Sequence, residues 1–263
     1  MSDSSISREW IRLSGPLFAE KSGDTSSHNR ILLHGFTQTS RSWDQYLELL
    51  DPQQLVTRVD APGHAGSSEL SLDLPSAAQT LADQCGFGDY VGYSMGARLC
   101  LHVACHRPDS VRRLVLISGT AGLRTQLDRD ERIESDERLA QQVLQEGVEA
   151  FVTTWLSNPM FSGLPKNRND VLDRMRNTPT GLATSLRMSG TGKQESLWDQ
   201  LRDLKMPVLL IVGENDEKFC RIGQEMKRMI GANAKLVVIK KSGHSVHLER
   251  PQDFQQVVEE FLG

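Results

Sequence analysis

A serine flanked by glycines is the part of this chain whose residues point most directly to chemistry. Ser94 lies in VGYSMGAR, where an apolar segment runs into Gly-x-Ser-x-Gly and then into the helix-like stretch MGARLCLHVACH. Such a strand-to-helix turn needs small residues beside the serine, because a side chain at Gly92 or Gly96 would collide with neighbouring backbone. The pattern predicts a nucleophile elbow that holds the Ser94 hydroxyl in a pocket.

An acid and a histidine follow in the order that such a serine requires. A serine hydroxyl becomes reactive at neutral pH when an imidazole accepts its proton and a carboxylate orients that imidazole. Asp216 lies in a turn after the apolar run VLLIVG, and His244 lies in a loop after the next run, KLVVIKKSG. The chain order serine, aspartate, histidine matches that of strand–turn–helix serine sites. We therefore predict that Ser94, Asp216 and His244 form a catalytic triad.

Two members of this triad have neighbours that could replace them. Asp216 is preferred for its position within the turn, although an exposed acidic turn would contain the same flanking residues, Glu214, Asn215 and Glu217. His247 competes with His244. We prefer His244 because it follows Gly243 directly after the predicted strand, whereas His247 begins the run HLERP that leads into a helix. We expect His247 to pack against the site or support it.

The segment LLHGFTQTSRSW supplies the remaining part of a serine site. A His-Gly turn after a strand lets a backbone N–H point at the pocket, where it pairs with the N–H of the residue after the serine. The predicted oxyanion hole therefore consists of the Phe36 and Met95 amides. We expect His34 to order this loop and to take no part in the reaction.

Short apolar runs that alternate with amphipathic stretches must position these residues. Runs of this kind predict an α/β fold with a mostly parallel central sheet and helices on both faces. The predicted strands lie in RILLHG, LVTRVDAPG, DYVGYS, VRRLVLISG, VLLIVGEND and KLVVIKKSG. The helices nearest the sheet are expected at residues 41–50, 76–84, 95–105, 223–230 and 251–261.

The interval 119–204 interrupts this alternation because it contains no convincing strand. It is charged, and its apolar residues at helical spacing are Leu139, Val143, Leu144, Val148, Phe151, Val152 and Trp155. We expect a helical cap at 119–204, inserted after about the sixth strand of an α/β core formed by 1–118 and 205–263. Such a cap begins and ends at the sheet edge that presents Ser94. A helical subdomain that only covers apolar surface is the alternative.

Composition excludes several other classes of protein. A chain of 263 residues, 38% hydrophobic, can bury a large core, and its net charge of −4 provides no basic stripe for nucleic acid. No leader pattern and no apolar stretch of membrane-spanning length is visible, so we expect a cytoplasmic protein without a membrane partner. The cysteines lack metal-ligand spacing and are expected to be reduced, mostly buried thiols: Cys85, Cys100, Cys105 and Cys220.

Beyond these features, the chain resembles the α/β-hydrolase superfamily over nearly its whole length. Within it, the chain looks most similar to the 2-succinyl-6-hydroxy-2,4-cyclohexadiene-1-carboxylate synthase family of menaquinone biosynthesis. The resemblance is carried by LHGFTQTSRSW, GYSMGAR, GLRTQLDRDERIESDERLA, SLRMSGTGKQESLW, GENDEKF and the W-x-x-x-P-x-F pattern of Trp155, Pro159 and Phe161. The last four of these motifs lie outside the general hydrolase pattern.

The resemblance implies an elimination without a metal or an organic cofactor. Family members remove pyruvate from a cyclohexene that carries succinyl and enolpyruvyl groups, so Ser94 would act as a base that abstracts a ring proton after His244 takes its own. The oxyanion hole would hold charge that develops on a substrate carbonyl. The alternatives are an esterase or carbon–carbon bond hydrolase with Ser94 as nucleophile, and a noncatalytic small-molecule receptor.

A polycarboxylate substrate needs positioned guanidinium groups, which bind carboxylates through paired hydrogen bonds. Arg98 lies about one turn along the helix that begins at the elbow. The resemblance adds further substrate-binding residues: Arg132, Arg176, Trp155 and, beside the serine, Tyr93. An esterase for neutral substrates would gain nothing from this arginine set. The expected partner is a small polycarboxylate, bound by a monomer or small homo-oligomer.

Two residues depart from the family pattern. Ala97 stands where a second glycine after the elbow is common, and Glu195 stands where a proline is common. The methyl group of Ala97 lies near the expected pocket floor. Neither change removes a predicted catalytic group, and both bear on fine substrate geometry.

Overall fold

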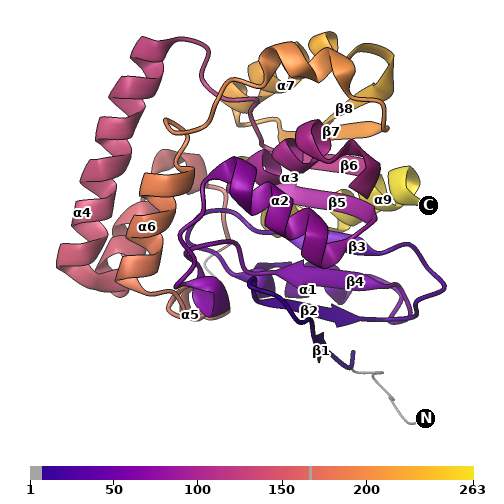
Figure 1. Cartoon of the computed structure of the whole chain (residues 1–263), viewed down its shortest axis with the longest axis horizontal. Helices are drawn as coiled ribbons and strands as arrows, with labels where there is room; N and C mark the ends of the chain where they lie inside the picture. The colour runs from indigo at the N-terminus through magenta and orange to yellow at the C-terminus, as the bar shows by residue number, and fades with distance from the viewer. Residues whose placement is uncertain (1–7, 166–167) are drawn as a thin grey trace.

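The computed structural model describes residues 8–165 and 168–263, which form an eight-stranded sheet with helices packed on both faces (Figure 1). The strand order is β1-β2-β4-β3-β5-β6-β7-β8. Strands β3 to β8 pair in parallel, and only the pairings of β1 and β2 are antiparallel. The predicted α/β class with a mostly parallel sheet is confirmed. The strands are β1 (Ile11–Arg12), β2 (Ala19–Ser22), β3 (Arg30–Leu33), β4 (Val56–Val59), β5 (Gly88–Tyr93), β6 (Val111–Ile117), β7 (Val208–Gly213) and β8 (Ala234–Ile239).

Each helix expected beside the sheet is present, with displaced ends. The helix expected at 41–50 is a 3-10 turn, Ser40–Trp43, followed by a short α-helix, and the one expected at 223–230 already begins at Glu217. The α-helices are α1 (Asp44–Leu47), α2 (Leu74–Cys85), α3 (Met95–His106), α4 (Gln126–Leu156), α5 (Arg168–Arg174), α6 (Pro179–Ser189), α7 (Glu217–Ile230), α8 (Val246–Glu249) and α9 (Pro251–Leu262).

The two edge strands β1 and β2 are absent from the sequence prediction. β2 has the sequence AEKS and β1 is two residues long with both residues exposed, so neither contains the apolar run that indicates a strand. β2 pairs with β4 from Ala19 opposite Val59 to Ser22 opposite Val56. These strands form through backbone pairing with an existing sheet, which leaves little trace in composition.

Alternating side chains divide the sheet between two apolar layers. In β6, Leu114 and Leu116 pack into the layer formed with α2, α3 and α7, whereas Val115 and Ile117 pack into the layer formed with α1 and α9. This is the period of two expected of a strand that is buried on both faces. In Figure 1, α2 and α3 lie in front of the sheet.

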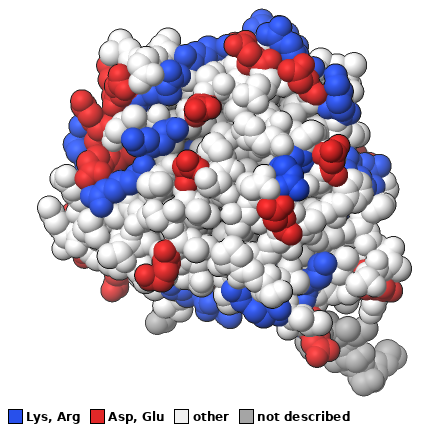
Figure 2. Space-filling model, in the orientation of Figure 1, with Lys and Arg blue, Asp and Glu red and all other residues white. Residues whose placement is uncertain are grey.

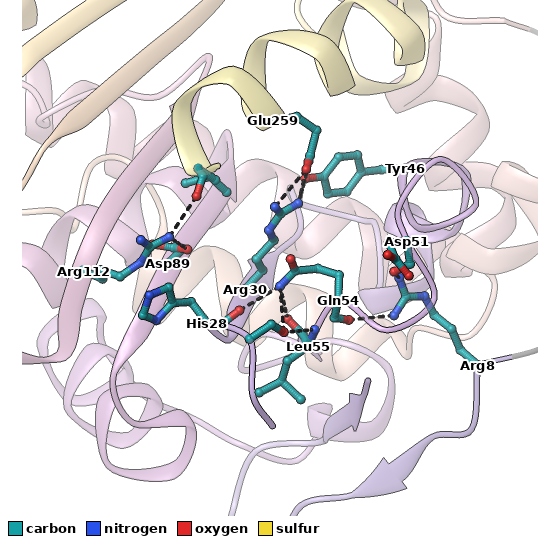
Figure 3. A network of polar contacts seen from close by, with 12 residues as sticks. Arg8, His28, Arg30, Tyr46, Asp51, Gln54, Leu55, Asp89, Arg112 and Glu259 are labelled. Atoms are coloured by element: carbon teal, nitrogen blue, oxygen red, sulfur yellow. Dashed lines mark hydrogen bonds and ion pairs between the residues drawn. The ribbon is translucent and has the colours of Figure 1, made fainter. Parts of the chain in front are cut away.

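A polar network fixes the C-terminal helix at the amino ends of the strands (Figure 3). Arg30, the first residue of β3, donates two hydrogen bonds of 2.5 and 2.9 Å to Glu259 of α9. Arg112 of β6 donates to Asp89 of β5 and to the carbonyl of Leu262. Because these charges are buried or half-buried and paired, they stabilise the edge opposite Ser94.

Between β6 and β7 the described residues form α4, α5, α6 and 3-10 turns, without a strand. α4 is interrupted at Gly147, whose φ of +79° and ψ of 171° are not helical. Its apolar residues pack against α6 in a separate small core. Leu144, one of the apolar residues at helical spacing, is 42% exposed because it lies beside the stripe of Ala140, Val143 and Phe151 that packs into this small core.

The two ends of this helical segment meet above the sheet. The Leu197 amide donates to the Ala121 carbonyl at 2.8 Å, and the Trp198 indole donates to the Gly122 carbonyl at 2.8 Å. We call these two hydrogen-bonded pairs the neck. After the neck, the 3-10 turn Trp198–Asp203 packs against α7 and leads to the start of β7. The segment bounded by Ala121 and Leu197 therefore leaves and rejoins the rest of the chain at one place.

The charge on the viewed face is mixed (Figure 2), and the cysteines are free. Figure 2 shows acidic and basic side chains interspersed over the viewed face. The four cysteines are free thiols, with Cys85 and Cys100 buried and the other two half-buried. No helix among the described residues has the length and apolarity needed to cross a membrane.

The elbow packing predicts a strong effect of one methyl group. A Cβ at Gly96 would lie 2.2 Å from the Leu33 carbonyl oxygen, a backbone atom that cannot move aside. We expect Gly96→Ala to lower the free energy of unfolding by about 2 kcal/mol or more in urea titrations. Gly223→Ala, within helix α7, is the control, since its Cβ would meet only side-chain ends, those of Leu236 at 3.0 Å and Val212 at 3.4 Å. Equal losses in the two variants would contradict this explanation.

Candidate active site

The three predicted triad residues lie together at the carboxyl edge of the sheet. His244 Nε2 is 3.1 Å from Ser94 Oγ, and His244 Nδ1 is 2.6 Å from Asp216 Oδ2. Ser94 follows β5, Asp216 follows β7 and the His244 loop follows β8. Parallel strands end at the same edge, so residues separated by about 150 positions converge there. The chain of hydrogen bonds can move a proton from the serine to the imidazole while the carboxylate orients the ring.

The backbone at Ser94 has the sharp turn expected of an elbow. Its φ is +51°, a value in the left-handed region that is strained for a residue with a side chain. A Cβ at Gly92 would lie 2.3 Å from the Gly96 carbonyl oxygen, which agrees with the steric argument from the sequence. The strained backbone and the close packing of Gly92 and Gly96 hold Ser94 in one position, in the turn between β5 and α3.

Asp216 is distinguished from the acids beside it by its hydrogen bonds. It is the N-cap of α7, where one carboxylate oxygen accepts from the Phe219 amide while the other faces His244. Glu214 is exposed and accepts from the Lys241 amide. Asn215 and Glu217 are exposed. Capping a helix thus holds the carboxylate in the orientation that the imidazole requires.

His247, the alternative to His244, and the loop histidine His34 both lie in different surroundings from His244. His247 is buried, with its ring 4.8 Å from Trp43 and 4.5 Å from Tyr93 between centroids, and burial lowers its pKa to about 3. His34 donates from Nδ1 to the Gly35 carbonyl and accepts at Nε2 from the Ala61 amide. Both therefore pack or order loops as neutral rings, which agrees with the sequence prediction.

The Phe36 and Met95 residues border the same cavity as Ser94 and His244. The Phe36 amide makes no hydrogen bond within the described part of the chain, and Met95 is the first residue of α3, where amides have no partner inside the helix. The loop after Phe36 is held by Asn177, which donates to the Thr37 carbonyl at 2.7 Å. Two amides are thus available near the serine for a developing negative charge.

The cavity has a volume of about 310 Å³ and combines aromatic walls with cationic side chains. Trp155 contributes one wall, in edge contact with Phe36 at 5.3 Å between centroids, and its buried indole N–H has no partner among the described residues. The cationic side chains that line the cavity are those of Arg98, Arg132, Arg174 and Lys218. A ligand that satisfies this lining is small, partly apolar and anionic.

Arg98 is the most informative of these cations. It is 7% exposed, and the only side-chain hydrogen bond that it makes to the described residues is donated from Nη1 to the Ser189 carbonyl at 2.8 Å. Burial, together with the charge of Arg132, lowers its pKa to about 10, so it stays charged at neutral pH. A buried guanidinium without a directly bonded carboxylate is costly. The remaining donors of Arg98 can be satisfied by an anionic ligand.

The structure does not bring Arg176 into this cavity. Its side chain is 42% exposed and lies near Asp173 in a separate depression on the surface. Arg174, which the sequence analysis missed, is 2% exposed, lines the cavity and donates to Asp170 and to Thr37. Arg174 is the last residue of α5, whereas Arg176 lies in the turn that follows the helix.

The other substrate residues predicted from the resemblance lie at the cavity. Arg132 lines it and is held by Asp136. Tyr93 also lines it, but its hydroxyl is hydrogen-bonded to the Ser245 hydroxyl at 2.7 Å. Tyr93 therefore supports the histidine loop in addition to bordering the cavity. Lys218 and Phe219, not singled out from the sequence, belong to the GENDEKF motif.

Glu249 holds the loop that carries His244 and was also missed. Its two carboxylate oxygens accept hydrogen bonds from the Gly243 amide at 2.6 Å and from the Ser245 amide at 3.0 Å. These amides belong to the residues before and after His244. A single carboxylate therefore fixes the backbone on both sides of the imidazole, and only its place in HLERP could have indicated it.

This contact predicts that Glu249→Ala slows reaction at Ser94, because a small displacement of a catalytic group is costly. We expect the rate at which a neutral fluorophosphonate labels Ser94 to fall by about tenfold or more. Asp253→Asn is the control, since that acid pairs with Arg250 on the surface of α9. Labelling of Glu249→Ala at the wild-type rate would show that the loop keeps its conformation without the carboxylate.

Comparison with known proteins agrees with this geometry. The model of the alpha/beta hydrolase family matches residues 31–257. A Bacillus subtilis (strain 168) protein provisionally named 2-succinyl-6-hydroxy-2,4-cyclohexadiene-1-carboxylate synthase is 39% identical over 91% of this chain and 92% of its own. The synthase of that name from Enterobacter sp. (strain 638) is 31% identical over 84% and 86%.

A solved structure, that of MenH from S. aureus, superposes with a TM-score of 0.85 at 29% identity and covers 93% of this chain and 97% of its own. The similarity extends through the core and the helical segment alike, since so much of each chain is included. The chain therefore belongs to the alpha/beta hydrolase family and, within it, to the family of the 2-succinyl-6-hydroxy-2,4-cyclohexadiene-1-carboxylate synthases.

Proposed function

We propose that the chain is a carbon–oxygen lyase that eliminates pyruvate from 2-succinyl-5-enolpyruvyl-6-hydroxy-3-cyclohexene-1-carboxylate, giving 2-succinyl-6-hydroxy-2,4-cyclohexadiene-1-carboxylate. The observation that carries the proposal is the contact between the Ser94–His244–Asp216 hydrogen-bond chain and a cavity lined by guanidinium groups. The names of the relatives that define its family support the same reaction.

In this reaction Ser94 acts as a base. His244 accepts the Ser94 proton, and the serine oxygen takes the proton from ring carbon C2. The electrons of that C–H bond form a C2=C3 double bond, the C3=C4 double bond shifts to C4=C5, and the C5–O bond breaks. The departing enolpyruvate takes the proton held by His244 and becomes pyruvate. The Phe36 and Met95 amides stabilise negative charge on the substrate carbonyl that conjugates with the deprotonated carbon.

The segment 119–204 serves as a cap in this proposal, and 1–118 with 205–263 serves as the catalytic core. Trp155 of α4 contacts Phe36 of the core loop beside Ser94, which supports a role for the segment in covering the substrate. The cytoplasmic location and the oligomeric state stay predictions from the sequence.

The deciding experiment measures pyruvate release from the enolpyruvyl substrate by the purified protein. Release at a rate far above background is the expected result. An absence of pyruvate together with rapid hydrolysis of a simple aryl ester would replace the lyase with an esterase in which Ser94 is the nucleophile. A protein that binds the substrate without converting it would instead be a receptor.

The triad predicts losses that do not multiply. Ser94→Ala, Asp216→Asn and His244→Ala should each lower kcat for pyruvate release by about 10³-fold or more, since the three side chains act as one unit. The double variant Ser94→Ala with His244→Ala should be no slower than the slower single variant. Losses in the double variant equal to the product of the single losses would reject the coupled triad.

The buried guanidinium of Arg98 predicts an effect on substrate binding. We expect Arg98→Ala to raise KM for the polycarboxylate by about tenfold or more, because a charge-assisted hydrogen bond is lost, and to leave the fold intact by circular dichroism. Arg176→Ala should keep the wild-type KM, since Arg176 lies outside the cavity. A larger increase in KM for Arg176→Ala than for Arg98→Ala would contradict this prediction and indicate that Arg176 binds the substrate.

A further inference from the structure

A buried acid borders the cationic part of the cavity without lining it. Asp136 of α4 is 3% exposed. Its Oδ1 accepts from Arg132 Nε at 2.7 Å, and its Oδ2 accepts from the Gly192 amide at 3.4 Å. A buried carboxylate is costly unless it is paired, and Asp136 is paired with Arg132, one of the cations that line the cavity.

The geometry of the Arg132 contact is informative. Asp136 bonds to Nε, and the terminal nitrogens Nη1 and Nη2 of Arg132 have no partner among the described residues. A guanidinium offers several donors in a fixed plane, so a carboxylate on one edge leaves the other edge available. Because Arg132 also lines the cavity, its unoccupied donors can bind a second carboxylate there.

Asp136 also fixes one wall of the cavity. The turn after α6 is held at both ends, since Arg98 donates to the Ser189 carbonyl and Asp136 accepts from the Gly192 amide. The turn packs so closely that a Cβ at Gly190 would lie 2.4 Å from Asp136 Oδ2. Ser189, Gly190 and Thr191 all line the cavity.

We infer that Asp136 is a positioning residue for the substrate carboxylates: it binds Arg132 at Nε and the turn at Gly192, so that the terminal guanidinium nitrogens of Arg132 face the ligand. This inference rests on the proposed function. It assigns to Asp136 a part in selecting polycarboxylate over neutral substrates, since neutral ligands gain nothing from the oriented donors. Asp136 itself does not touch the reacting atoms.

The first test compares KM and kcat for pyruvate release in Asp136→Asn, Arg132→Met and the double variant. Asp136→Asn should raise KM by about tenfold and change kcat much less. In the Arg132→Met background the same substitution should add little, because Asp136 acts through the arginine. The control is Glu137→Gln, which removes a surface ion pair between α4 and Arg187 of α6 and should leave KM unchanged.

In a second background, Arg132→Lys, the substitution Asp136→Asn should lower KM, whereas in the wild-type protein it should raise KM. In Arg132→Lys the single ammonium group is bound by Asp136, so KM should rise about as much as in Arg132→Met although the charge is kept. Adding Asp136→Asn to Arg132→Lys should then release the ammonium for the substrate and lower KM. A wild-type KM for Arg132→Lys, or a further rise on adding Asp136→Asn, would overturn the inference.

A separate readout distinguishes positioning from general damage. Labelling of Ser94 by a neutral fluorophosphonate measures whether the catalytic groups are intact without using the carboxylate site, and it should stay near the wild-type rate in Asp136→Asn. A parallel fall in labelling and in kcat/KM would assign Asp136 a structural role only and reject the inference. If the wild-type protein released no pyruvate, the proposed function would fail instead.

Discussion

Direct backbone contact at the carboxyl edge of the sheet is the constraint on which the site depends. Gly96 lies against Leu33, and a Cβ on Gly213 would be 2.0 Å from the Gly243 carbonyl oxygen. The second contact brings the end of β7, which precedes Asp216, against the loop that carries His244. Only residues without a side chain permit this approach. The triad distances follow from how closely four segments of backbone can pack.

The three arginines that line the cavity beside this rigid backbone differ in their hydrogen-bond partners. Arg174 is held by both Asp170 and Thr37, Arg132 is held on one edge, and Arg98 is bonded only to a carbonyl. Of these three arginines, Arg98 alone has no carboxylate or hydroxyl partner among the described residues, and it is buried close to the elbow. A buried guanidinium with unpaired N–H donors is costly for the protein. An anionic ligand that accepts from those donors offsets this cost, so the site favours an anion.

Much of this arrangement could be predicted from the sequence because it depends on local patterns. An apolar run followed by a turn places Ser94, Asp216 and His244 at the same edge once the strands are parallel. The rest depends on contacts between distant segments. Whether Arg174 or Arg176 enters the cavity is set by how α5 ends, and Glu249 reaches back to a loop whose sequence does not indicate a partner. β1 and β2 lack an apolar run of their own and are defined by backbone pairing at the edge of the sheet.

The neck at Ala121 and Leu197 has a consequence for how such proteins can diverge. Because the helical segment leaves and returns through two adjacent hydrogen-bonded pairs, Ala121 with Leu197 and Gly122 with Trp198, its length and sequence can change without shifting the register of β6 and β7. In the proposed function, the reacting residues belong to the core, whereas the cavity-lining residues Arg132, Trp155 and Arg174 belong to the inserted segment. New substrate preferences can therefore arise by exchange of the inserted unit alone, while the reactive serine and its partners are inherited unchanged.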